Sequence, residues 1–186
     1  MEGAAVMRRN LWKSVALLSF ALMLGTGGAA WAANPATISV TVTIQALSVS
    51  ASGPIAFGTV TASSSTVSGA SSTVTNDGNV TETFSLSLTN PATWTAVQAA
   101  PAAAEEYALL AQFNSAAPTS GSFTYANYAL STTSVASSAT KFAGNQNGLS
   151  LPATTVRNLW FRFDAPISTA VTTQQTITVT VTASAG

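Results

Sequence analysis

Two segments near the ends of the chain alternate apolar and polar residues with a strict period of two, and neither contains a charged residue. The apolar positions are Ile38, Val40, Val42 and Ile44 in the first segment and Ile177, Val179 and Val181 in the second. Serine or threonine fills each position between them. Because successive side chains of a β-strand point to opposite faces, the pattern predicts a half-buried strand at each end.

The interior of the chain repeats this alternation. It predicts strands over residues 55–60, 73–75, 80–88, 107–113 and 157–163. The residues expected in the core include Phe84, Leu86, Leu88, Leu159, Phe161 and Phe163. Loops rich in Ser, Thr, Gly and Asn separate the strands, and no segment shows sustained helical periodicity. The sequence therefore predicts an all-β fold, a single antiparallel β-sandwich of seven to nine strands.

The tetrapeptide Asn76-Asp77-Gly78-Asn79 lies between two of the predicted strands. Asn and Gly tolerate the positive φ angles of tight turns, so this tetrapeptide predicts a β-hairpin. Calcium binding at Asp77 is the alternative, but calcium requires several oxygen ligands and the turn offers one carboxylate. The hairpin is the better interpretation.

Residues 1–32 have the features of a signal peptide. Arg8, Arg9 and Lys13 precede an apolar run over residues 15–24, which is about half the length that a membrane span requires. Ala30-Trp31-Ala32 then supplies the small residues of a cleavage site. We expect residues 33–186 to form one secreted domain, extracellular or at the cell surface, without a membrane span after cleavage.

The expected mature chain has little charge, and the whole sequence lacks histidine and cysteine. After residue 32, three basic residues face five acidic ones, so the clustered basic charge that nucleic acids and anionic membranes attract is missing. Thiol catalysis, disulfides and thiolate metal sites are excluded, and acid–base catalysis would rest on a few carboxylates and one lysine. We expect no enzyme, no bound metal and no cofactor.

Two short motifs carry a resemblance. Residues 75–86, Thr-Asn-Asp-Gly-Asn-Val-Thr-Glu-Thr-Phe-Ser-Leu, resemble the strand-turn-strand signature of immunoglobulin-like domains in bacterial surface proteins. Residues 38–59, an alternating strand that leads to Ile-Ala-Phe-Gly-Thr, are similar to the opening of secreted pilin-like sandwiches of the spore coat protein U type. Those domains usually carry a cysteine pair that this chain lacks. The resemblance implies an immunoglobulin-like or pilin-like sandwich and secretion.

The first function that fits these features is a structural one. An uncharged strand directly after the cleavage site can leave its own subunit and complete the next, which builds a filament or surface layer by β-strand addition. Residues 33–50 are then the donated or edge strand, and the partner is a second copy of the chain. The alternative for this strand is pairing with the C-terminal strand of the same subunit. The proposed self-assembly residues are Ile38, Val40, Val42 and Ile44.

The second function is a monomeric carbohydrate-binding or adhesin module. Trp160, Asn158 and Arg162 lie on the face of their predicted strand opposite the core, where they would form a platform for a surface polysaccharide or an interface. Burial of Trp160 under a neighbouring loop is the alternative, because a large ring is seldom left exposed.

Overall fold

The structure, a computed structural model, describes residues 36–186, and the predicted signal peptide lies outside the described residues. Every described helix and strand belongs to the compact unit Thr43–Gly186, while the other unit ends at Val42. Within residues 36–186, no helix is long and apolar enough to cross a membrane.

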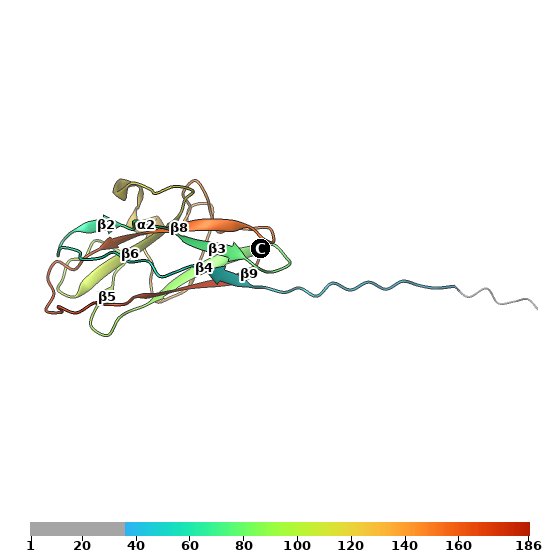
Figure 1. The fold of residues 1–186 in the computed structure, drawn as a ribbon, viewed down its shortest axis with the longest axis horizontal. Coiled ribbons are helices and arrows are strands. Elements are labelled where there is room, and N and C mark those ends of the chain that lie inside the picture. The colour runs from blue at the N-terminus through green and yellow to red at the C-terminus, as the bar shows by residue number, and fades with distance from the viewer. Residues whose placement is uncertain (1–35) are drawn as a thin grey trace, which may run out of the picture. The chain divides into compact units, whose positions relative to one another are not determined.

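Six strands form the larger sheet (Figure 1). Its order is β1 (Val49–Ala51), β3 (Ser72–Asn76), β8 (Val156–Asp164), β6 (Glu106–Phe113) and β5 (Thr95–Ala96). Strand β2 (Ser65–Val67) also pairs with β8, beyond the end of β3. All of these pairs are antiparallel except the short pair of β5 with β6.

Three strands form the second sheet, in the order β7 (Val135–Ala136), β4 (Glu82–Thr89) and β9 (Thr178–Ala185). Strand β9 pairs with β4 along its whole length, with Leu86 opposite Val181. The two sheets make the predicted all-β sandwich, and the nine strands of residues 36–186 are at the upper end of the expected number.

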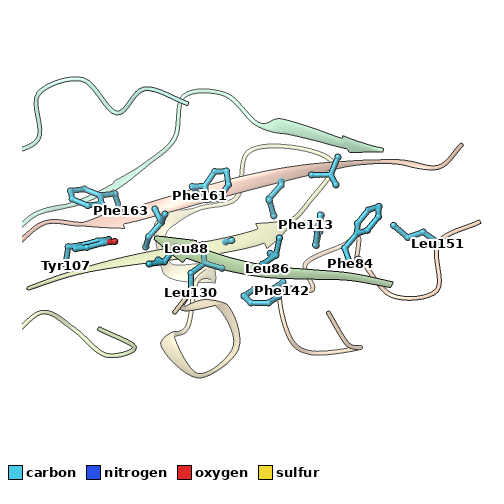
Figure 2. Packing of buried hydrophobic residues seen from close by; sticks show 14 of the residues in the cluster. Phe84, Leu86, Leu88, Tyr107, Phe113, Leu130, Phe142, Leu151, Phe161 and Phe163 are labelled. Carbon is cyan, nitrogen blue, oxygen red and sulfur yellow. The ribbon is translucent and has the colours of Figure 1, made fainter. Parts of the chain in front are cut away.

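The main core lies between the sheets (Figure 2). Phe84 and Leu86 of β4 have no exposed surface, and their side chains point toward β6 and β8. Three ring pairs with centroids 5.6 to 5.9 Å apart surround Phe163, whose partners are Phe57, Trp94 and Tyr107. The predicted inward positions of β4 and β8 are confirmed, because all six of the apolar residues expected in the core are buried: Phe84, Leu86, Leu88, Leu159, Phe161 and Phe163.

The outer face of the larger sheet carries a second, smaller apolar cluster. The short helix α2 (Tyr125–Tyr128), the 3-10 turn η1 (Ser120–Ser122) and their loops lie beside β6 and β2. The buried members of this cluster are Ala108, Leu110, Phe123, Tyr128 and Ala129. Strand β6 is therefore buried on both faces, whereas alternation predicted a single buried face.

The predicted hairpin at Asn76–Asn79 is wrong. The strands before and after it, β3 and β4, belong to different sheets, so the segment is a connection between sheets. Asn76 is fully buried and donates its side-chain amide to the carbonyls of Val80 and Leu151, at 2.9 Å each. Gly78 is required here by close approach, because a Cβ would collide with Glu82 Oε1 and lie 2.5 Å from the Ala46 carbonyl oxygen.

Two other predicted strands are absent from the described chain. Residues 55–60 form no strand, since Pro54 has no N–H to donate and Gly58 adopts a φ of +67° that ends an extended run. Ile55 and Phe57 still pack against the core. Residues 38–44 form no strand either.

Candidate functional site

The side chains of the four proposed self-assembly residues are largely exposed to solvent. Their exposed fractions are 89% for Ile38, 80% for Val40, 81% for Val42 and 80% for Ile44. Single exposed apolar residues are ordinary, but a row of four branched ones without an intervening charge is a surface that proteins usually cover. The sequence predicted this row to be half buried. Residues 36–186 do not bury it.

The connection between β3 and β4 holds the C-terminal end of the segment that carries this row, at residues 44–46. The side chain of Asn79 accepts a hydrogen bond from the Ala46 N–H and donates one to the Ile44 carbonyl, both at 2.8 Å. The Asn79 N–H also donates to the Ala46 carbonyl at 3.1 Å. Asn79 thus acts as a strand partner for residues 44–46, although those residues belong to no strand.

Two further hydrogen bonds hold Ser48. Its N–H donates to Glu82 Oε1 at 2.8 Å, and its carbonyl accepts from the Asp77 N–H at 2.8 Å. Glu82 is fully buried, and its second oxygen, Oε2, has no hydrogen-bond partner. We call residues 76–82 the anchor loop. The sequence indicated a turn here but gave no signal that the turn would hold the N-terminal segment.

Strand β9 is an edge strand of the three-stranded sheet, and among the described residues it pairs with β4 alone. Its inward row is only partly buried, in contrast to the neighbouring β4 row. Strand β1 of the other sheet lies beside β9. In these two strands and the chain next to them, the partly buried apolar residues that pack against the core are Val49, Ile55, Phe57, Val60, Ile177, Val179, Val181 and Ala183. We call this row of residues the open seam.

The predicted ligand platform is occupied by contacts within the chain. The guanidinium of Arg162 donates to both carboxylate oxygens of Asp164, at 2.9 and 2.7 Å, and to two backbone carbonyls. Arg162 also lies over the ring of Tyr125, whose hydroxyl donates to Asp164 at 2.7 Å. Burial opposes ionisation of Asp164, but hydrogen bonds from Arg162, Ser65 and Tyr125 outweigh it and hold the carboxyl pKa below its ordinary value.

The side chains of the other two platform residues also donate hydrogen bonds to backbone carbonyls of the chain. Trp160 is partly buried against the second cluster, and its indole N–H donates to the Asn114 carbonyl at 2.9 Å. The side-chain amide of Asn158 donates to the Ser115 carbonyl at 3.4 Å. The structure therefore brings the three residues together under the loop that follows β6, as the alternative interpretation of Trp160 anticipated.

Within residues 36–186, no group of three or more acidic, histidine or cysteine side chains could hold a metal ion. The adjacent acids Glu105 and Glu106 bind different partners. Glu105 accepts from the Thr169 hydroxyl and the Ala170 N–H, which lower its pKa, and Glu106 accepts from the N–H groups of Ala102 and Ala103. These hydrogen bonds hold the two carboxylates against different segments of the chain.

Comparison with protein-family models, curated proteins and solved structures finds no match to this chain. The candidate site is accordingly defined by geometry alone: an exposed apolar row at residues 38–44, an anchor loop at its base, and an open seam beside β9.

Proposed function

We propose that this chain is a secreted structural subunit that assembles into an extracellular filament or surface layer by β-strand addition. The observation that carries the proposal is the row of four exposed, branched apolar side chains at residues 38–44. Burial of each would contribute roughly 1.5–3 kcal/mol before the cost of association. This is enough to stabilise contact between subunits once the backbone groups are also paired.

The acceptor in this proposal is the free edge of β9 in a second copy. An added strand there would pair with the unused N–H and C=O groups of β9 and extend the three-stranded sheet. Its apolar face would cover the open seam, whose inward row on β9 has the same period of two as residues 38–44. The donated side chains would then complete the side of the core that the subunit leaves partly exposed.

The composition of the two strands supports the same proposal. Soluble sandwiches usually protect an edge strand with lysine, an interior proline or a bulge. Neither residues 38–44 nor β9 contains a charged residue or a proline. With few charges on the chain, like-charge repulsion between neighbouring subunits is also small.

A double substitution tests the proposal. Val40→Asp with Val42→Asp places two carboxylates on the face that should be buried, and we expect it to abolish assembly of the secreted protein. The matched control is Thr41→Asp with Thr43→Asp, which adds the same charge on the opposite face of the strand. Light scattering and negative-stain microscopy should show filaments for the wild type and the control only.

A wild-type protein that stays monomeric at every concentration, without filaments under near-native conditions, would overturn the proposal. A monomeric binding module would then be the better interpretation. Equal loss of assembly in both double variants would instead show that added charge, rather than burial of the apolar face, causes the effect.

A further inference from the structure

The anchor loop holds one side of the backbone of the N-terminal segment. Its five hydrogen bonds reach the Ile44 carbonyl, both backbone groups of Ala46 and both backbone groups of Ser48. These three residues are spaced by two, so the groups lie along one edge of an extended segment. Strand β1 continues directly from Val49, which pairs with Asn76. Residues 44–51 thus form one line of backbone fixed to the subunit.

The apolar row ends where this line begins. Ile44 is the last of the four exposed apolar residues and also the first residue that the anchor loop holds. An unrestrained linker between a domain and its donated strand would behave as a flexible chain and let neighbouring subunits rotate. In this chain, no unrestrained residue separates the exposed apolar row from the anchored residues 44–51, because Ile44 belongs to both.

We infer that Asn79 and Glu82 are positioning residues that hold the N-terminal strand at its base and make the joint between successive subunits rigid. The inference rests on the proposed function. Asn79 fixes residues 44 and 46, and Glu82 fixes residue 48. Gly78 contributes by its lack of a Cβ, because any larger residue would push the Ala46 carbonyl and the Glu82 carboxylate out of place. Donation is then limited to residues up to Ile44, and the filament is stiff with a uniform repeat.

Asn79→Ala tests the inference. Asn79 is exposed, so the fold should survive, but the side-chain bonds to Ile44 and Ala46 are lost. We expect the Ala46 amide to exchange with solvent at least about tenfold faster, while the Ser48 amide, which is bonded to Glu82, changes less. Filaments should form but bend, with a persistence length several-fold below that of the wild type.

The matched control is Asn145→Ala. Asn145 is a similarly exposed asparagine whose side chain also makes two hydrogen bonds to a loop, both to Ser115, at 2.8 and 2.7 Å. It should alter neither Ala46 exchange nor filament stiffness. Asn79→Asp should be intermediate, because it keeps the acceptor for Ala46 and loses the donor to Ile44.

The two measurements, Ala46 amide exchange and filament stiffness, distinguish a failure of the inference from a failure of the proposed function. Equal Ala46 exchange in the wild type and Asn79→Ala overturns the anchor, with or without filaments. Flexible Ala46 combined with filaments of wild-type stiffness overturns its role in the joint. A protected Ala46 in a wild-type protein that never assembles supports the anchor and overturns the proposed function.

Discussion

The two alternating segments have nearly the same sequence pattern but different structures. In β9, the inward residues Val179 and Val181 pack against the core, and the strand pairs with β4 over its whole length. In residues 38–44, the same kind of residue is about four-fifths exposed or more and belongs to no described strand. Alternation therefore specifies a strand conformation and an apolar face, but it does not specify the partner.

The difference can be traced to what lies beside each segment. Strand β4 lies on one side of β9. The buried phenylalanine and leucines of β4 favour a single register between the two strands. The other side of β9 is a free edge in the described chain. Residues 38–44 have an exposed apolar face and belong to no described strand. Each segment has what the other lacks, and the proposed assembly follows from this complementarity.

Removal of a buried side chain of β4, which supports β9, should destabilise the subunit most. Phe84→Ala deletes a fully buried ring of β4 and should cost about 3–5 kcal/mol in the free energy of unfolding. Ser85→Ala, at the next position and on the other face of the strand, should cost less than about 1 kcal/mol. A urea titration measures both, and equal losses would contradict the observed orientation of β4.

A matched pair of substitutions compares the terminal segments directly. Val181→Asp puts a carboxylate into the partly buried row of β9 and should cost about 2–3 kcal/mol of subunit stability. Val42→Asp, made in the exposed row, should change subunit stability by less than about 0.5 kcal/mol. Chemical unfolding of the monomer at low concentration measures both. A similar loss at Val42 would mean that the N-terminal strand pairs within its own subunit.

The long strands β4, β6, β8 and β9 could be predicted from the sequence, because period-two alternation and burial are two aspects of one geometry. Phe84 and Phe161 were expected in the core and lie there. Alternation works least well where a strand has no solvent face. Strand β6 is covered on both sides, so its run of buried residues carries no information on which face meets which cluster.

The connections between strands could not be predicted in the same way. Asn and Gly suit a hairpin, but they also suit the crossing at residues 76–79, where Asn76 is buried and Gly78 allows close approach. The anchor depends on contacts between residues that are 29 to 35 positions apart, from Ser48 with Asp77 to Ile44 with Asn79. A single sequence gives no signal for such a pair. Glu82 appeared as an ordinary charge because its buried carboxylate depends on the same long-range contact.

A proline substitution tests whether the free edge of β9 is the acceptor, because proline has no N–H to pair with an added strand. Gly186 donates to the Thr81 carbonyl, so by alternation the even-numbered N–H groups face β4 and the N–H of Ala183 faces the free edge. Ala183→Pro should cost the subunit about 1 kcal/mol or less and should block assembly. The matched control, Ala183→Val, adds similar bulk but keeps the N–H, so it should assemble. Sedimentation and a thermal melt measure both, and wild-type assembly by Ala183→Pro would exclude this edge as the acceptor.

The smallest expected effect is that of pH, and it should fall outside the proposed interface. Neither residues 38–44 nor β9 contains an ionisable side chain, so assembly between about pH 5 and pH 8 should be flat and insensitive to salt.

The stability of the domain itself should depend on pH only at lower pH. The pKa of Asp164 is held below its ordinary value in the fold, so this carboxylate stabilises the fold above that ordinary value. Its contribution is lost as the pH falls through the lowered pKa, and Arg162 then loses its partner. Thermal melts should therefore decline below about pH 4. Asp164→Asn should flatten that decline without changing assembly at neutral pH. A steep pH dependence of assembly near neutrality would place an ionisable group in the interface and contradict the pairing of the two uncharged strands.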